Sequence, residues 1–128
     1  MCGIVGYFDY QRLGFQLSSE KFNPMIDSLS HRGPDGRGSY QEPGIGLGHR
    51  RLAILDVDGD RAGQPMGLEK REVWLTFNGE IYNYRELKKE LKSLGHNFHT
   101  TSDTEVLLHS YLEWGVECLE KLNGIFAF

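Results

Sequence analysis

Cysteine is scarce in this chain, and long hydrophobic runs are missing. Only two cysteines, Cys2 and Cys118, occur in 128 residues, which argues against the dense disulfide framework of small secreted domains. No apolar run approaches the roughly 18 residues of a membrane-spanning helix, and no positively charged leader precedes an apolar stretch. We therefore expect a cytoplasmic protein with reduced thiols and no membrane partner, in which Cys118 is a buried, inert residue.

Basic patches and nucleotide-binding loops are missing as well. The formal net charge is −4, and the longest basic clusters are only pairs, such as Arg50-Arg51 and Lys88-Lys89, so we expect no nucleic-acid partner. The sequence contains neither a G-x-x-x-x-G-K-[ST] phosphate loop nor a G-x-G-x-x-G fingerprint after a strand. A metal site is not predicted, because the spacing His96-x-x-His99 has no third or fourth ligand nearby.

Glycine, in contrast, is abundant. The chain has 16 glycines, above the usual share of about 7%, which indicates a turn-rich chain with many short strands. Its length suits one modest domain and is too short for two ordinary ones. The sequence stops on an apolar strand pattern, Ile125-Phe126-Ala127-Phe128, whereas domain ends are usually polar. We therefore expect a domain that is truncated at its C-terminus.

The hydrophobic pattern predicts a mixture of strands and helices. The expected strands span residues 3–9, 45–47, 52–56 and 72–77; the expected helices span about 18–30, 83–95 and 102–115. Both later helices begin with the spacing of a capping box, Asn83 with Glu86 and Ser102 with Glu105. The first helix ends in a predicted loop, 31–38 (HRGPDGRG). Because strands come in runs and helices return to cover them, we expect an α+β layered sandwich.

Cys2 is the candidate nucleophile. Removal of Met1 would leave a thiol and a free α-amine on one residue, so that the amine could act as the base. An α-amine titrates near about 7.7 to 8.0 and a thiol near about 8.5, so part of the amine can accept the thiol proton at neutral pH. A cysteine after Met1 is more often an ordinary residue, so this interpretation needs partners elsewhere in the chain.

Asn78-Gly79 follows a predicted strand and has two interpretations. The first is a tight turn, because Asn-Gly is the strongest short hairpin signal. The second is an oxyanion hole, in which the side-chain amide of Asn78 and the backbone N–H of Gly79 donate to a developing oxyanion. In that interpretation glycine leaves room for the substrate. A turn could present both donors, so the two interpretations are compatible.

Arg51 and Asp103 are candidate partners for a zwitterionic amino acid. The guanidinium of Arg51 fits a carboxylate, although a structural ion pair is the commoner role. Asp103 lies in the first turn of a predicted helix, where an acid either stabilises the helix end or binds an ammonium group. The segment HRGPD is interpreted as a self-bonded structural loop, in which Arg32 and Asp35 fix the loop against the site.

The chain also resembles a known family. The resemblance rests on seven ordered segments: MCGIVGYF, HRGPDGRG, GHRRLAILD, QPM, FNGEIYNYREL, SDTEVLLHSY and NGIFAF. Together they resemble the N-terminal glutaminase domain of glutamine-hydrolysing asparagine synthetases, a class II glutamine amidotransferase of the N-terminal nucleophile (Ntn) hydrolase superfamily. The resemblance covers essentially the whole chain. It implies a four-layer αββα sandwich and the hydrolysis of L-glutamine to glutamate and ammonia.

The resemblance further implies a role for each candidate residue. Cys2 would attack the carboxamide and form a thioester, and Asn78 with Gly79 would hold the oxyanion. Arg51 would bind the α-carboxylate of glutamine. The groups that would receive the α-ammonium are Asp103, Glu80 and the carbonyl of Gly79.

In such families the ammonia passes to an ATP-dependent synthetase domain in cis, which activates aspartate as an acyl adenylate. ATP and Mg²⁺ would belong to that domain, whose SGGxDS-like loop is absent from residues 1–128, so we expect no cofactor here. Two other interpretations stay open. The chain could be an inactive fragment or a glutamine-binding regulatory module, or it could be the amidotransferase domain of a related synthetase with another acceptor.

Overall fold

The computed structural model describes residues 1–11, 13–54, 62–68 and 73–128. The elements are β1 (Gly3–Phe8), α1 (Ser19–Asp27), β2 (Gly36–Glu42), β3 (Ile45–Arg51), β4 (Met66–Leu68), β5 (Val73–Leu75), β6 (Asn78–Ile81), α2 (Tyr84–Ser93), α3 (Asp103–Trp114), the 3₁₀-helix η3 (Gly115–Glu120) and β7 (Gly124–Ala127). This mixture of helices and strands confirms the predicted α+β class. No helix in these described parts is long and apolar enough to cross a membrane.

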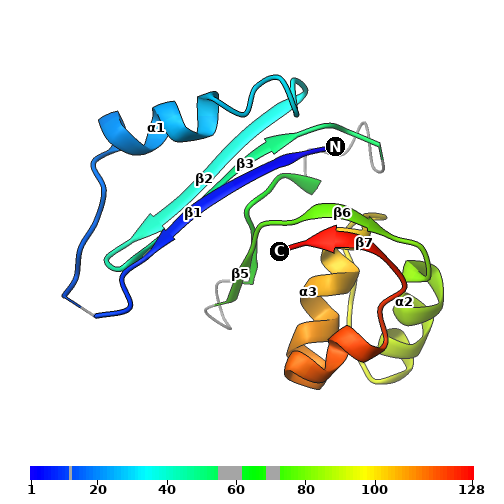
Figure 1. The fold of residues 1–128 in the computed structure, drawn as a ribbon. Helices are drawn as coiled ribbons and strands as arrows, with labels where there is room; N and C mark the ends of the chain where they lie inside the picture. Colours follow the sequence, from blue (N-terminus) through cyan, green and yellow to red (C-terminus); the bar gives the residue numbers. More distant parts are fainter. Residues whose placement is uncertain (12, 55–61, 69–72) are drawn as a thin grey trace.

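The first half of the chain forms an antiparallel sheet of strand order β1-β3-β2. Helix α1 lies along this sheet (Figure 1) and buries Phe22 and Ile26 completely. The helix approaches β3 so closely that a Cβ at Gly48 would lie 2.5 Å from Ile26. Glycine at this position therefore lets α1 pack directly on the backbone of the sheet.

The other face of this sheet carries two of the candidate site residues. Gly3 and Arg50 lie opposite each other in the register of β1 and β3. Both face α1, since Arg50 Nη1 is 3.8 Å from Asp27 Oδ1. Successive residues of a strand point to opposite faces. Cys2 and Arg51, their neighbours in the sequence, therefore point away from α1 toward the second half of the chain.

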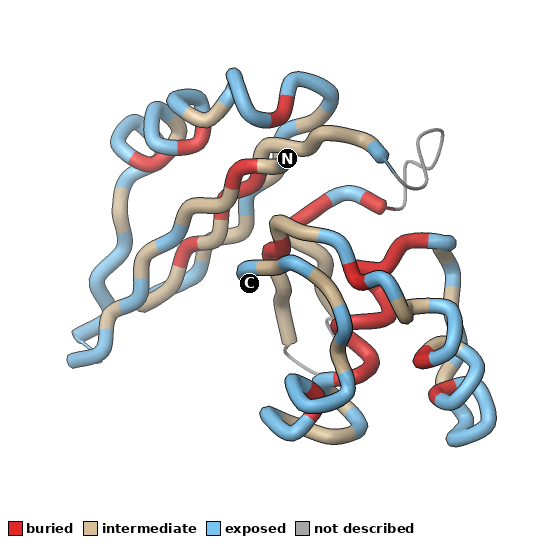
Figure 2. The backbone as a smooth tube through the Cα atoms, turned by 45° about the vertical axis from the view of Figure 1, so that its right-hand side comes forward, coloured by how far each residue is buried: buried red, intermediate tan, exposed pale blue. Residues whose placement is uncertain are grey.

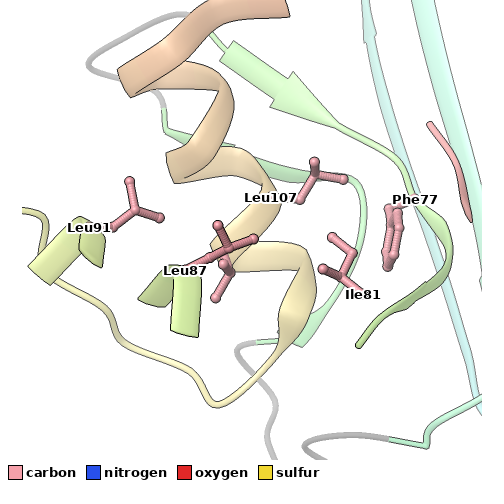
Figure 3. Close-up of a cluster of buried hydrophobic side chains, with 6 residues drawn as sticks. Phe77, Ile81, Leu87, Leu91 and Leu107 are labelled. Atoms are coloured by element: carbon pink, nitrogen blue, oxygen red, sulfur yellow. The ribbon is translucent and has the colours of Figure 1, made fainter. Parts of the chain in front are cut away.

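The second half packs around α2 and α3. Its strands form two short antiparallel pairs, β4-β5 and β6-β7. A buried cluster holds this half together (Figure 3) and consists of Phe77, Ile81, Leu87, Leu91, Val106 and Leu107. In Figure 1 the β6-β7 pair lies between the three-stranded sheet and helices α2 and α3. The described strands on this side form separate pairs, so the continuous four-layer sandwich stays a prediction.

Among the described helices, α3 is the most deeply buried (Figure 2). Its predicted N-cap, Ser102, is confirmed. The side chain of Ser102 accepts a hydrogen bond from the N–H of Thr104 at 3.0 Å, as an N-cap does. The capping box is not closed, however. The carboxylate of Glu105 accepts hydrogen bonds from the N–H groups of His99 and Thr100, both at 2.8 Å. Glu105 thus fixes the preceding loop to the helix.

Helix α2 confirms the second predicted helix, again with a different cap. The Asn83 side chain makes no capping bond to α2; its Nδ2 donates to the carbonyl of Lys121 at 2.9 Å, and its Oδ1 accepts from the N–H of Asn123 at 2.9 Å. The side chain therefore connects the start of α2 to the segment before β7. Further along the chain, Cys118 is 1% exposed, and burial raises the pKa of its thiol, which agrees with the predicted buried residue.

Several predicted boundaries were wrong. Strand β2 begins inside the segment predicted as a loop, because GRGSYQE has no apolar alternation that would reveal a strand. Strand β3 continues to Arg51, and residues 52–54 lie in no strand; residues 55–56 of the predicted strand are outside the described residues. Helix α1 ends at Asp27 rather than near Ser30. The predicted strand 72–77 is strand only over β5, and residue 72 is not described.

Candidate active site

One pocket brings together most of the predicted site residues. It lies between the end of the three-stranded sheet and the segment formed by β6 and the start of α3. Of the candidate residues, the pocket is lined by Cys2, Arg51, Gly79, Glu80 and Asp103. Asn78 is not among the lining residues. Residues from four separate segments thus meet at one site, as the sequence analysis expected, but Asn78, which it also placed there, does not line the pocket.

The thiol of Cys2 is held by the backbone of Leu52. The N–H of Leu52 donates to Cys2 Sγ at 3.3 Å, and the thiol donates to the carbonyl of Leu52 at 3.6 Å. The carbonyl of Cys2 accepts a hydrogen bond from Arg32 Nε at 3.0 Å. Cys2 is half-buried. The sulfur therefore has a fixed position at the pocket wall while part of the residue stays accessible.

The HRGPD segment holds this wall in place. Arg32 bonds to Cys2, and Asp35 Oδ2 accepts a hydrogen bond from the N–H of Ala53 at 2.9 Å. This confirms the predicted role of Arg32 and Asp35 in fixing the loop against the site. These two side chains bond to neighbouring segments, however, and not to each other as a self-bonded loop would require. The segment therefore acts as a brace between β1 and the end of β3.

Arg51 ends β3, whereas the sequence analysis placed it before a strand. Its carbonyl accepts a hydrogen bond from the N–H of Asp35 at 3.0 Å, and a Cβ at Gly33 would lie 2.6 Å from its backbone N. The half-buried side chain lines the pocket. Burial chiefly, and then the positive charge of Arg51, lower the pKa of His49 to about 4. His49 is therefore neutral near pH 7, and Arg51 supplies a positive charge to the pocket at this end of β3.

Asp103 is a buried carboxylate at the opposite wall, with 5% of its surface exposed. Burial raises the pKa of Asp103, the N–H groups of Ile81 and Thr104 act in the opposite direction, and the charge of Glu80 adds to the rise. The bond from the N–H of Ile81 to Asp103 Oδ2 measures 3.0 Å. Among the described residues, the donors to this buried carboxylate are backbone N–H groups. Such a group is well placed to receive a cation, because the cation would offset the lost hydration.

The turn interpretation of Asn78-Gly79 was wrong. Both residues begin β6, where Asn78 lies opposite Ala127 and Gly79 opposite Phe126 of β7. The structure adds a reason for glycine beside the expected one, because a Cβ at Gly79 would collide with the carbonyl oxygen of Ile125. The Oδ1 atom of Asn78 is buried without a hydrogen-bond partner among the described residues. Buried amides are rarely left so, which marks Asn78 as a functional candidate.

Several residues of the pocket are not among the predicted ones, and three of them contribute polar or backbone groups. Leu52, Gln64 and Thr104 line the same pocket as the predicted residues. Leu52 acts through its backbone, so its side chain carries no signal. Thr104 follows Asp103 directly and could have been included on that ground. Gln64 belongs to the segment QPM, where a polar residue before proline reads as an ordinary turn.

Comparisons with known proteins give a consistent result. Residues 1–128 match the family described as "Glutamine amidotransferase domain". The chain is 48% identical to asparagine synthetase [glutamine-hydrolyzing] 3 and 45% identical to asparagine synthetase [glutamine-hydrolyzing] 1 of Bacillus subtilis. It is 43% identical to asparagine synthetase [glutamine-hydrolyzing] 1 of Arabidopsis thaliana. Each match covers 100% of this chain but only 20% to 21% of the relative, so the chain spans about a fifth of their length.

Proposed function

Because this chain belongs to the glutamine amidotransferase domain family, we propose that it hydrolyses L-glutamine to glutamate and ammonia. The proposal is carried by one observation, namely that a single pocket contains a fixed thiol, a cation and a buried carboxylate: Cys2, Arg51 and Asp103. The names of the relatives, which describe glutamine-hydrolysing asparagine synthetases, support glutamine as the substrate class.

Arg51 and Asp103 would bind the two charged ends of glutamine. The guanidinium of Arg51 offers a planar pair of donors that suits the α-carboxylate. Asp103, with the exposed Glu80 and the carbonyl of Gly79 nearby, would bind the α-ammonium. An amino acid held at both charged ends extends its side chain in one direction. The proposed direction is toward Cys2, which lines the same pocket.

Met1 has a direct bearing on the chemistry. Met1 lines the pocket and is 57% exposed, so its removal would vacate space beside Cys2 and leave the α-amine on Cys2 itself. That amine would accept the thiol proton while Sγ attacks the carboxamide carbon. The tetrahedral intermediate would then collapse, with the proton delivered to the departing nitrogen, to give ammonia and a thioester. Water would hydrolyse the thioester to glutamate and regenerate the thiol.

Asn78 and Gly79 would stabilise the oxyanion of both tetrahedral intermediates. The backbone N–H of Gly79 and the amide Nδ2 of Asn78 are the proposed donors. Gly79 already lines the pocket, whereas Asn78 does not, so the Asn78 amide would have to turn toward the substrate. Its buried Oδ1 lacks a partner among the described residues, which lowers the cost of such a rotation because no hydrogen bond to Oδ1 is broken.

The role of the chain in a larger enzyme follows the same reasoning. We propose that the complete domain is a four-layer αββα sandwich of the Ntn hydrolase type. Its ammonia would pass to an ATP-dependent synthetase domain that amidates aspartate, and ATP and Mg²⁺ would bind in that domain. This chain would then need no cofactor of its own. The proposed setting is the cytoplasm, with neither nucleic acid nor membrane as a partner.

The decisive experiment uses the complete protein and its Cys2→Ala variant. Intact mass should show that Met1 is removed, and an electrophilic glutamine analogue should label Cys2. Glutamine should release ammonia and glutamate in equal amounts, and Cys2→Ala should abolish both. Retention of Met1 in the active protein would refute the proposed base. Glutamine binding without ammonia release would instead support a regulatory module, and amidation of another acceptor would support a different synthetase.

A further inference from the structure

We propose that Gln64 is a positioning residue that couples the oxyanion end of the pocket to its ammonium-binding end; this inference rests on the proposed glutaminase function. Gln64 is buried, with 8% of its surface exposed, and it lines the pocket. Its Oε1 accepts a hydrogen bond from the backbone N–H of Phe77 at 2.6 Å. Its Nε2 donates to Thr104 Oγ1 at 3.2 Å. Both ends of one amide are therefore bound to other segments of the pocket.

The two partners of Gln64 adjoin different parts of the proposed machinery. Phe77 directly precedes Asn78 and Gly79, the proposed oxyanion donors. Thr104 directly follows Asp103, the proposed ammonium partner. A side-chain amide offers an acceptor and a donor in one plane, so it can fix two backbone segments at a set separation. Methionine has similar size but can replace neither hydrogen bond.

Gln64 is also anchored to the sheet that carries the nucleophile. A Cβ at Gly38 of β2 would collide with the carbonyl oxygen of Gln64, so the backbone of Gln64 lies directly against the three-stranded sheet. That sheet carries Cys2 and Arg51 at the same end. Gln64 therefore touches all three structural parts of the pocket, whereas Thr104 and Phe77 each belong to one.

This geometry predicts that two substitutions affect KM and kcat differently. Thr104→Val removes only the link to the Asp103 segment, so it should raise KM for glutamine and leave kcat near the wild-type value. Gln64→Met also leaves the N–H of Phe77 without its partner. It should therefore lower kcat as well as raise KM, and reduce kcat/KM by about tenfold or more, as small misplacements of reacting groups do.

Two further variants separate positioning from general stability. Gln64→Glu retains an acceptor for the N–H of Phe77, and its second oxygen can accept from the Thr104 hydroxyl, so kcat should recover most of its value. Gln41→Met is the matched control. Gln41 Nε2 also makes two hydrogen bonds, to Tyr7 Oη at 3.1 Å and to the carbonyl of Leu17 at 3.0 Å, but on the α1 side of the sheet. Gln41→Met should change neither constant.

The test uses steady-state ammonia release by the complete protein, with thermal melting to confirm that each variant is folded at the assay temperature. A folded Gln64→Met variant with wild-type KM and kcat would overturn the inference. If Gln64→Met does not fold, Thr104→Val decides, and an unchanged KM there would overturn it. A wild-type protein without Cys2-dependent ammonia release would instead refute the proposed function, and the inference would fall with it.

Discussion

The backbone N–H of Leu52 donates a hydrogen bond to the sulfur of Cys2 at 3.3 Å. Leu52 follows Arg51 directly, so the segment that ends β3 both holds Cys2, the proposed nucleophile, and carries the guanidinium of Arg51. The backbone of Arg51 and Leu52 therefore fixes the thiol of Cys2 relative to Arg51, the proposed binding group for the α-carboxylate of glutamine. The HRGPD segment bonds to both partners of this contact. Arg32 donates to the carbonyl of Cys2, and Asp35 accepts from the N–H of Ala53, the residue after Leu52.

Arg51→Ala should raise KM for glutamine by about tenfold to a hundredfold, because a hydrogen bond to a charged group contributes about 1.5–3 kcal/mol. Arg51→Lys should recover only part of this loss, since an ammonium cannot bind a carboxylate bidentately. The measurement is steady-state ammonia release. Arg37→Ala is the control, since Arg37 pairs with Asp27 at 2.9 Å on the α1 side. Equal effects of the two alanine variants would contradict the assignment.

Asp103→Asn should separate stability from substrate binding. Burial raises the pKa of Asp103 in the folded protein, so the folded state binds its proton more tightly than the unfolded state does. The free energy of unfolding contributed by this group is therefore greatest below its unfolded pKa, and it falls as pH rises through the raised folded pKa. At pH 7 the neutral asparagine avoids this cost, and the variant should be at least as stable as the wild type.

The same substitution should weaken glutamine binding at pH 7, because the partner of the α-ammonium has lost its charge. In the wild type, KM should rise as the pH falls toward the raised pKa of Asp103, while the variant should not show this step. Urea unfolding at neutral and acidic pH, with KM measured at the same values, provides the comparison. A variant that is less stable but binds glutamine normally would assign Asp103 to structure alone.

Local signals predicted much of the pocket wall that is proposed to bind the α-ammonium. Ser102 and the following apolar pattern indicated the start of α3, which placed Asp103 in its first turn. The start of β1 was also predicted from local sequence, because Gly3 begins an apolar and aromatic run and Cys2 directly precedes that run. Both predictions rest on residues close together in the sequence, where propensity and capping act directly.

The contacts that complete the site depend on distant segments and could not be predicted. Asn78-Gly79 has the composition of a turn, but pairing with β7 makes it a strand, and no local signal reveals that partner. The amide of Gln64 is buried between Phe77 and Thr104, to which it is hydrogen-bonded. Tertiary context overrode local preference at these positions.

A second polar cluster, whose residues do not line the pocket, should contribute to stability and not to catalysis. His96 Nδ1 lies 2.9 Å from His109 Nδ1, and His96 Nε2 lies 2.8 Å from Glu113 Oε2. His96→Ala should therefore lower the free energy of unfolding by about 1 kcal/mol or more, with kcat and KM unchanged. Urea unfolding tests this, and His99→Ala serves as the control because His99 is exposed and bonds to α3 through its backbone N–H. Loss of activity in a folded His96→Ala variant would contradict the expected separation.

Gly79→Ala should lower the stability of the protein by disturbing the contact with β7, in addition to any effect on glutamine binding. The added Cβ would collide with the carbonyl oxygen of Ile125 and lie 2.6 Å from Phe126 Cα, so the β6-β7 pair must shift. Overpacking of this kind costs about 1–3 kcal/mol, and the loss should appear in urea unfolding without any ligand. Glu80→Ala, an exposed position on the same strand, should change stability by less than about 0.5 kcal/mol. If Gly79→Ala kept full stability and lost only activity, the glycine would be required by the substrate, and the strand contact would not explain it.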